Sequence, residues 1–168
     1  MGPLQELSIV THSAQETGDL GEALGALARP GDLLLLSGDL GTGKTCLVQG
    51  IARGLGVQTA VRSPTFVFAT EHMGRLPLYH VDLYRVDDPR EADGLGLDDY
   101  IEGDGVCAVE WADRAIDLFP ADHLLIEMTH VGIDDRSLRF LPSGQRYMEL
   151  LSRLKEHIEA KRPAGPHA

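Results

Sequence analysis

The chain has 168 residues, a formal net charge of −11 at pH 7 and a pI near 4.9. This length suits one domain with a buried core, and the acidity argues against direct binding of DNA or RNA, since phosphate neutralisation needs clustered lysine and arginine. The two cysteines make no disulfide framework and no apolar stretch reaches membrane length, so we expect a cytoplasmic protein without a DNA or membrane partner.

The first predicted elements are a strand over residues 4–10 and a helix that follows it. Ser13-Ala14-Gln15-Glu16 has the spacing of a capping box, which is typical of a helix start. The apolar face of this helix consists of Leu20, Leu24 and Leu27. Gly18, Gly21 and Gly25 each lower helix stability by about 1 kcal/mol relative to alanine. We therefore expect another segment to approach the backbone of this helix closely.

Residues 38–45, which follow the apolar run 33–36, match G-x-x-x-x-G-K-[ST] at every fixed position between a predicted strand and a predicted helix. The glycines let backbone N–H groups converge on phosphate oxygens, and the positive end of the helix points at the same anion. Lys44 would reach the β- and γ-phosphates, and the Thr45 hydroxyl would bind Mg²⁺. The segment therefore predicts a site for ATP or GTP. The residues expected to contact the nucleotide are Asp39, Leu40, Gly41, Thr42, Gly43, Lys44, Thr45 and Cys46.

A glycine-rich turn that matches by chance is the alternative interpretation. The preceding strand and the following helix supply the context that a phosphate-binding loop requires. Lys44 is also the only lysine before Lys155 in a chain that otherwise uses arginine. A compact point charge at this one place favours the phosphate-binding interpretation.

The middle of the chain predicts a β-hairpin followed by a short helix. Gly54-Leu55-Gly56 ends the helix after the loop, and residues 63–68 begin an extended segment. Met73-Gly74 can turn this segment back onto residues 76–82 as an antiparallel pair. Asp87-Asp88-Pro89 then starts a helix, because proline suits the first helical turn.

The last third of the chain predicts three strands and a helix. Residues 106–111 and 123–128 form apolar strands, and residues 137–141 pair with the second of these. The helix carries an apolar stripe of Tyr147, Leu150, Leu151, Leu154 and Ile158. We expect one domain over residues 1–161 and a frayed tail over residues 162–168. The expected fold is an α/β three-layer sandwich of the P-loop NTPase class, with a mostly parallel central sheet and antiparallel strands at an edge.

A carboxylate at the carboxyl end of a buried strand is needed near Thr45 and Mg²⁺. Asp82, Glu110 and Glu127 each end a predicted strand, and composition alone does not choose among them. Glu110 follows the most continuous apolar run, as a central parallel strand would. Glu127 lies in a strand that we expect to be antiparallel, near an edge and solvated. Asp82 could bind Mg²⁺ through a water or orient the attacking water.

Three further side chains have both a functional and a structural interpretation. His80 shares a sheet face with Asp82 and could contact phosphate, although a hydrogen-bonded structural histidine is the commoner case. Thr65 could sense the γ-phosphate or simply open a strand. Trp111 could pack near the nucleotide or a partner, or belong to the core.

Several segments taken together resemble the TsaE (YjeE) family. They are Gly-Asp-Leu-Gly-Thr-Gly-Lys-Thr at 38–45, Ser-Pro-Thr-Phe at 63–66, His-Val-Asp-Leu-Tyr-Arg at 80–85, Glu-Trp at 110–111 and Thr-Gly-Asp-Leu-Gly at 17–21. The resemblance covers nearly the whole chain. It implies an ATPase that works with TsaB and TsaD in making threonylcarbamoyladenosine next to the anticodon of tRNAs that read ANN codons. TsaD would transfer the threonylcarbamoyl group, and slow ATP hydrolysis by this chain would support turnover of the complex.

The resemblance also implies roles for single residues. Thr45 and Glu110 become Mg²⁺ ligands, and Lys44 becomes the phosphate clamp. Asp82 becomes a residue needed for hydrolysis. Thr17 would lie near the adenine, which also gives a reason for the glycines in its helix.

The chain departs from the family pattern at two positions. Cys46 stands where the family usually has a second threonine, but its backbone N–H can still reach the α-phosphate, so we expect binding to survive. Phe66 replaces a frequent tyrosine, which puts little in doubt. Arg136 could contact a phosphate or lie on the surface.

Three other function classes share the loop. A small-molecule phosphotransferase is the main alternative, but such an enzyme normally needs an arginine-rich lid, and the chain has no dense arginine cluster. A signalling GTPase needs an Asn/Thr-Lys-x-Asp motif to read the base, and the chain contains no asparagine. A nucleotide-binding scaffold without turnover would have the same loop.

Overall fold

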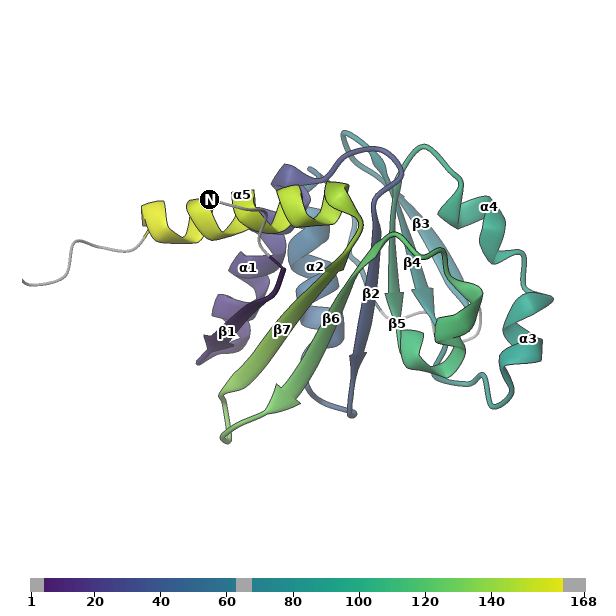
Figure 1. The fold of residues 1–168 in the computed structure, drawn as a ribbon, viewed down its shortest axis with the longest axis horizontal. Coiled ribbons are helices and arrows are strands. Elements are labelled where there is room, and N and C mark those ends of the chain that lie inside the picture. Colours follow the sequence, from purple (N-terminus) through teal and green to yellow (C-terminus); the bar gives the residue numbers. More distant parts are fainter. Residues whose placement is uncertain (1–4, 63–67, 162–168) are drawn as a thin grey trace, which may run out of the picture.

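The computed structural model describes residues 5–62 and 68–161. Thr65, Phe66 and the tail at 162–168, for which the sequence makes predictions, lie outside the described residues. The described residues form one sheet of seven strands in the order β1-β7-β6-β2-β5-β4-β3 (Figure 1). The strands are β1 (Leu7–Thr11), β2 (Leu33–Gly38), β3 (Ala69–Met73), β4 (Pro77–Asp82), β5 (Val106–Glu110), β6 (His123–His130) and β7 (Arg136–Ser143).

The centre of the sheet is parallel. β2 pairs in parallel with β5 and β6, and β4 pairs in parallel with β5. β7 and β3 run the opposite way beside β6 and β4, and β1 is antiparallel to β7. Because parallel strands share their carboxyl end, the register places Asp82 beside Glu110 and Glu110 beside Leu36. The centre of the sheet is parallel as predicted, and the antiparallel strands lie on both sides of it.

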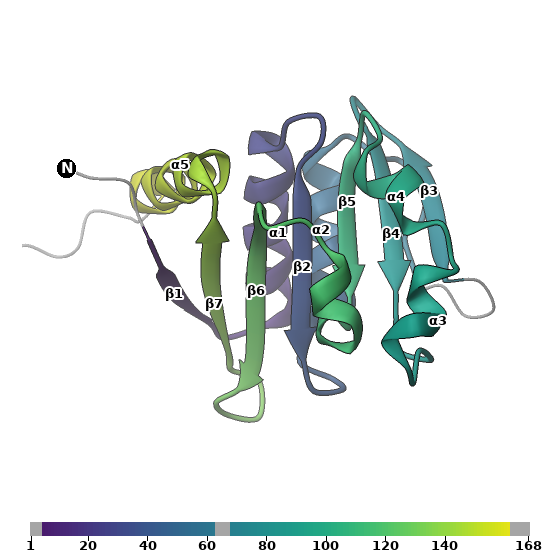
Figure 2. The same ribbon diagram turned by 45° about the vertical axis from the view of Figure 1, so that its right-hand side comes forward.

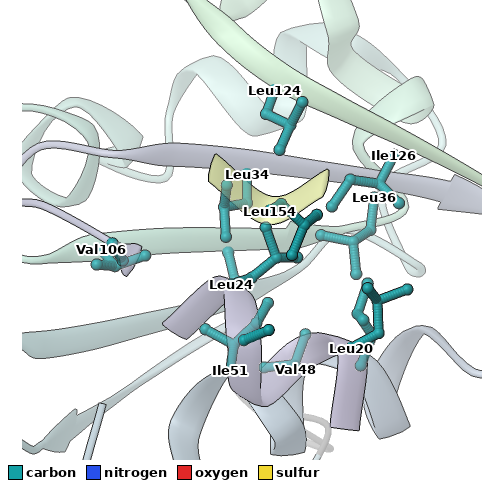
Figure 3. Packing of buried hydrophobic residues seen from close by; sticks show 14 of the residues in the cluster. Leu20, Leu24, Leu34, Leu36, Val48, Ile51, Val106, Leu124, Ile126 and Leu154 are labelled. Atoms are coloured by element: carbon teal, nitrogen blue, oxygen red, sulfur yellow. The ribbon is translucent and has the colours of Figure 1, made fainter. Parts of the chain in front are cut away.

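Helices cover both faces of the sheet, which makes three layers (Figure 1, Figure 2). One face carries α1 (Ala14–Leu27), α2 (Lys44–Gly54) and α5 (Gln145–Lys161), and the other carries α3 (Pro89–Asp93), α4 (Leu97–Ile101) and the 3-10 segment η1 (Ala112–Leu118). Alternate side chains of β2 enter the two layers. Leu34 and Leu36 pack with α1, α2 and α5 (Figure 3), whereas Leu33 and Leu35 join the cluster on the other face. In the described ranges, no helix is long and apolar enough to cross a membrane.

The first helix begins where its capping residues predict. Ser13 Oγ accepts the Glu16 N–H at 3.1 Å, and the Glu16 carboxylate accepts the His12 N–H at 2.6 Å. In a standard capping box the Glu16 carboxylate would accept the N–H of the N-cap residue Ser13, whereas here it accepts the N–H of the residue before it. α3 also begins as predicted, with a proline in its first turn and Asp88 Oδ1 accepting the Arg90 N–H at 2.9 Å.

α1 and α2 pack with their backbones in close contact, and this contact explains Gly21 and Gly25 of α1. A Cβ at Gly21 would lie 2.3 Å from the Leu47 carbonyl oxygen, and a Cβ at Gly25 would lie 2.2 Å from another carbonyl oxygen of α2. From the other side, a Cβ at Gly50 would lie 2.1 Å from the Gly18 carbonyl oxygen. Such separations exclude any side chain at these positions. The expected close approach is confirmed, and the approaching segment is α2, so an adjacent adenine is not needed to account for Gly21 and Gly25.

One prediction about the sheet is wrong. The strand that holds Glu127, β6, is third from the β1 side and is parallel to β2 on one flank, although it is antiparallel to β7 on the other. The hairpin signal is local and predicts only the β7 pairing, whereas the β2 pairing joins Leu34 to Leu124 across most of the chain. The Glu127 side chain is 41% exposed and accepts a 3.4 Å hydrogen bond from Arg139, so its solvated position is as expected.

A buried ion pair joins the start of β2 to α5. Asp32, directly before β2, is only 3% exposed. Its carboxylate accepts hydrogen bonds from Arg146 Nε at 2.9 Å and Nη2 at 2.7 Å, and it also accepts the Arg29 N–H at 2.8 Å. A guanidinium therefore meets both oxygens of this acid, at the end of the sheet opposite to Asp82 and Glu110.

Candidate functional site

The glycine-rich loop connects β2 to α2 at the carboxyl end of the parallel strands. Thr42 is fully buried and closes the loop on itself, because its N–H and its hydroxyl both donate to the Asp39 carbonyl oxygen, at 3.3 and 2.9 Å. Gly43 precedes α2 with a φ of +98°, a left-handed conformation that favours glycine. The loop thus presents the first turn of α2, whose N–H groups no helical carbonyl accepts, at this end of the sheet.

Lys44 is held against its own loop. Its ammonium donates to the carbonyl oxygens of Gly38 at 2.7 Å and Asp39 at 2.9 Å, and it lies 4.1 Å from the centre of the Trp111 ring. Burial lowers the pKa of Lys44, and the nearby acid Glu110 opposes this effect. A compact positive charge therefore lies beside the first turn of α2.

Glu110 ends β5 and is only 2% exposed. The Thr45 hydroxyl donates to this carboxylate, with Oγ1 2.9 Å from Oε1 and 3.2 Å from Oε2. On the adjacent strand β4, His80 lies with Nε2 2.5 Å from Glu110 Oε2. The structure brings the loop threonine and the favoured acid together, and it places the histidine behind the acid, where it does not line the cavity described below.

Asp82 ends β4 beside Glu110 and is half-buried. Burial raises the pKa of Asp82, the Tyr84 N–H that its Oδ1 accepts at 2.8 Å lowers it, and the neighbouring Glu110 raises it. The net direction is upward. A carboxyl group with a raised pKa beside a second acid is suited to accept a proton during a reaction.

Trp111 follows Glu110 with a φ of +58°, and no other non-glycine residue in the described part of the chain has a positive φ. Its ring packs against Tyr84 with ring centres 5.0 Å apart. The Arg114 guanidinium lies 5.4 Å from the centre of the Trp111 ring and 5.9 Å from that of Tyr84. Trp111 is partly buried: it packs against the hydrophobic cluster on this face of the sheet and also lines the cavity described below.

These groups line one cavity of about 1050 Å³, which is large enough for a nucleotide. The predicted site residues at its wall are Leu40, Gly41, Gly43, Lys44, Thr45, Cys46, Asp82, Glu110 and Trp111. Asp39 and Thr42 belong to the loop but do not line the cavity. Thr17 is buried beside Gly43, and its hydroxyl lies 2.7 Å from that of Thr11. Nine of the predicted residues therefore share this cavity, whereas Asp39, Thr42 and Thr17 lie away from its wall and Thr65 lies outside the described residues.

The oxygen donors at this cavity fit Mg²⁺. Among the residues that the structure describes, no group of three or more His, Cys, Asp or Glu side chains is placed to hold a metal ion. Mg²⁺ is usually bound through one or two protein oxygens, while waters and substrate phosphates complete its shell. Thr45 Oγ1 and the Glu110 carboxylate supply such oxygens at one point.

Comparison with known proteins shows which family this arrangement belongs to. Residues 11–138 match the family described as threonylcarbamoyl adenosine biosynthesis protein TsaE. The chain belongs to the TsaE family. A tRNA threonylcarbamoyladenosine biosynthesis protein TsaE from Bacillus subtilis (strain 168) is 43% identical over 155 residues, which are 92% of this chain and 97% of that protein. A protein of the same name from Treponema pallidum (strain Nichols) is 38% identical over 137 residues, which are 82% of this chain and 94% of that one.

A solved structure supports the same conclusion about the fold. The crystal structure of YdiB from Bacillus subtilis matches this TsaE-family chain with a TM-score of 0.82 at 38% identity, covering 94% of this chain and 99% of that chain. The family resemblance and the α/β fold class predicted from the motifs are both confirmed. Every predicted site residue lies within the matched range 11–138.

Two other residues of this TsaE-family chain contact neighbouring backbone. Arg136 Nη2 donates to the Gly41 carbonyl oxygen at 3.3 Å, and Nη1 donates to the Ile133 carbonyl oxygen at 3.1 Å. Arg136 therefore braces the loop from the β6–β7 turn, a role that neither sequence interpretation includes. Cys46 Sγ donates to the Ala14 carbonyl oxygen at 3.1 Å, and burial raises the pKa of its thiol.

The sequence patterns do not predict a large part of the cavity wall. This part consists of Phe68, Ala69, Tyr84, Arg85, Val86, Glu91, Leu95 and Tyr100. Most of these residues come from α3, α4 or the segments beside them, whose position over the sheet depends on long-range packing. Tyr84 and Arg85 carry a usable signal, because they closely follow Asp82 at the end of a strand.

Proposed function

We propose that this TsaE-family chain binds ATP with Mg²⁺ and hydrolyses it slowly, as an accessory protein in making threonylcarbamoyladenosine in tRNA. The observation that carries the proposal is the convergence of Lys44, Thr45 and Glu110 on one cavity. The family description and the names of both relatives supply the tRNA part of the proposal.

The loop and its first helical turn hold the phosphates in this proposal. The N–H groups at the start of α2 and the partial positive charge of the helix attract an anion. Lys44 now donates to two loop carbonyls, and the same ammonium protons are those that phosphate oxygens would accept. Exchange of carbonyl oxygens for charged phosphate oxygens makes these hydrogen bonds stronger.

Thr45 and Glu110 are the residues that would hold Mg²⁺. When bound, Mg²⁺ would neutralise negative charge that develops on the transferred phosphoryl group. The Thr45 hydroxyl donates its proton to Glu110, and a hydroxyl oxygen is a suitable ligand for Mg²⁺. Glu110 adds the negative charge that favours a divalent ion at this point.

Asp82 is the residue that we assign to the attacking water. Its carboxyl group lines the same cavity as Lys44, and the Tyr84 N–H fixes the position of Oδ1. A raised pKa makes this group a better proton acceptor than an ordinary aspartate. Hydrolysis is expected to be slow by the chain alone, because partners often complete the catalytic set of such enzymes.

We propose TsaB and TsaD as the partners, with tRNA reached through their complex. The net charge of −11 supports indirect contact with RNA. Leu40 in the loop is 73% exposed, and Ile133 in the adjacent turn is 94% exposed. Large apolar side chains exposed beside a nucleotide site are suited to contact with a protein partner.

The size of the cavity favours one alternative, a small-molecule phosphotransferase. The side of the cavity near α3 and α4, with Phe68, Leu95 and Tyr100, would then hold an acceptor. The two functions differ in the fate of the γ-phosphate. An accessory ATPase releases inorganic phosphate, whereas a phosphotransferase leaves the phosphate on another molecule.

Reconstitution tests the proposal. Threonylcarbamoylation of tRNA is measured over many turnovers in three reactions that all contain TsaB and TsaD. One also contains the parent chain, one contains its Lys44→Ala variant, and one contains neither. Released inorganic phosphate is measured in the same reactions. We expect repeated turnover and phosphate release with the parent chain only. Equal product formation without this chain would contradict the tRNA role, and ATP consumption without inorganic phosphate would favour the phosphotransferase.

A further inference from the structure

We propose that His80 is a positioning residue, which holds the Glu110 carboxylate in the orientation that receives Mg²⁺. This inference rests on the proposed function, because it concerns the same metal site. It gives a role to a histidine that does not line the cavity and therefore does not touch a ligand there.

The position of His80 follows from the register of the sheet. β4 and β5 are adjacent and parallel, and Asp82 is beside Glu110 at their carboxyl ends. His80 lies two residues before Asp82, one layer deeper in the sheet, and its side chain is 0% exposed. From there its Nε2 reaches Glu110 Oε2 at 2.5 Å. The imidazole therefore approaches the acid from the protein interior, while the Thr45 hydroxyl approaches it from the loop.

The surroundings of the two ring nitrogens show which of them donates a hydrogen bond. His80 Nδ1 is buried and has no hydrogen-bond partner among the described residues. A proton on Nδ1 would be a buried donor without an acceptor, whereas a proton on Nε2 has the Glu110 carboxylate as its acceptor. The geometry therefore makes Nε2 the ring nitrogen that donates, with the Glu110 carboxylate as its acceptor.

A purely structural role does not account for an imidazole at this place. A fully buried ring with one nitrogen unsatisfied is worse solvated in the core than an apolar side chain of similar size. Within residues 5–62 and 68–161, the one polar contact of the ring is with Glu110. Fixed hydrogen bonds to a metal-binding carboxylate set its orientation, and their loss commonly weakens metal binding by about 10–100-fold.

His72 provides a matched control within the same hairpin. It lies on β3, the strand next to β4, and its ring nitrogens contact the hydroxyls of Thr59 and Thr70 at 3.3 and 3.2 Å. His72 is half-buried and does not line the cavity. Its replacement tests the effect of losing a histidine from this sheet without touching Glu110.

The test compares His80→Leu, His80→Gln and His72→Leu with the parent chain. Mn²⁺ replaces Mg²⁺, and its binding in the presence of a non-hydrolysable ATP analogue is followed from the paramagnetic resonance signal of free Mn²⁺. We expect about 10–100-fold weaker Mn²⁺ binding for His80→Leu. His80→Gln should lie within about threefold of the parent, because the glutamine amide N–H reaches about as far as the imidazole Nε2–H. His72→Leu should match the parent, and affinity for the analogue in EDTA should be equal in all four proteins.

Equal Mn²⁺ binding by His80→Leu and the parent would overturn the inference while leaving the proposed function intact. Failure of the parent chain itself to bind Mn²⁺ with the analogue would instead overturn the proposed metal site. If His80→Leu does not fold, His80→Gln and a nitrogen-15 spectrum of the parent decide the matter. We expect that spectrum to show a proton on Nε2 of His80, and an Nε2 that carries no proton would refute the inference.

Discussion

Asp32 and Glu110 are both almost completely buried acids, and they lie at opposite ends of neighbouring parallel strands. A guanidinium meets both oxygens of Asp32, and this acid does not line the nucleotide-sized cavity. Glu110 instead receives a hydroxyl from Thr45 and an imidazole from the adjacent strand, and it lines the cavity of about 1050 Å³. Burial alone therefore does not distinguish a structural acid from a functional one. The kind of partner and the access to a cavity do.

Removal of the structural acid should have the largest effect on stability. In Asp32→Ala the Arg146 guanidinium loses its buried partner, so we expect the free energy of unfolding to fall by about 3–5 kcal/mol. Urea unfolding measures this change. Glu22→Ala, which removes an exposed carboxylate 3.8 Å from Arg53, is the control and should cost less than about 1 kcal/mol. The nucleotide affinity of the folded Asp32→Ala protein should stay within about twofold of the parent. A large loss of affinity would show that Asp32 also serves the nucleotide site, which would contradict the distinction between a structural and a functional acid.

Removal of the functional acid should have the reverse pattern. We expect Glu110→Gln to slow Mg²⁺-dependent ATP hydrolysis on the order of 100-fold, because the metal site loses a negative oxygen ligand. The free energy of unfolding should change less than in Asp32→Ala, since glutamine keeps the volume and its amide oxygen still accepts from Thr45 or from His80. Glu127→Gln, within β6 and not at its end as the sequence predicted, is the matched control and should keep parental activity. Unchanged hydrolysis in Glu110→Gln would remove this residue from the metal site.

Replacement of Asp82 should have a smaller effect on stability, and this effect should depend on pH. Burial raises the folded-state pKa of Asp82 above its ordinary value of 3.8, so ionisation of this group destabilises the folded chain as pH rises through the folded pKa. We expect Asp82→Asn to melt at a higher temperature than the parent at pH 7.5 in EDTA, while its ATP hydrolysis is lost. The difference in melting temperature should vanish as pH falls below 3.8, where the parent carboxyl is protonated in both states. A lower melting temperature of Asp82→Asn at pH 7.5 would contradict the assigned direction.

Local signals predict one of these two acids and not the other. Glu110 follows a continuous apolar strand, and the glycine-rich loop predicts a metal-binding acid at the end of such a strand. The sequence alone therefore favours Glu110. Asp32 precedes an equally apolar strand, but its partner Arg146 is 114 residues away, and no pattern joins them. His80 likewise reaches Glu110 from 30 residues away.

The same distinction holds for the fold. The capped start of α1, the stop after α2 and the β6–β7 hairpin depend on neighbours in the chain, and they form as predicted. The parallel pairing of β6 with β2 and the placement of α3 and α4 over the cavity depend on packing between distant segments. Because the sequence patterns do not contain these long-range contacts, the predicted position of the strand that holds Glu127 is wrong and part of the cavity wall is not predicted.

The direct backbone contact between α1 and α2 limits how this chain can be recombined with a relative. A side chain introduced at Gly21 or Gly50 would meet a main-chain carbonyl of the opposite helix, which cannot move aside as a flexible side chain can. A chimera with its crossover between the two helices would thus join surfaces that were selected in different proteins. A crossover after Gly56 would transfer both helices and the loop as one inherited unit.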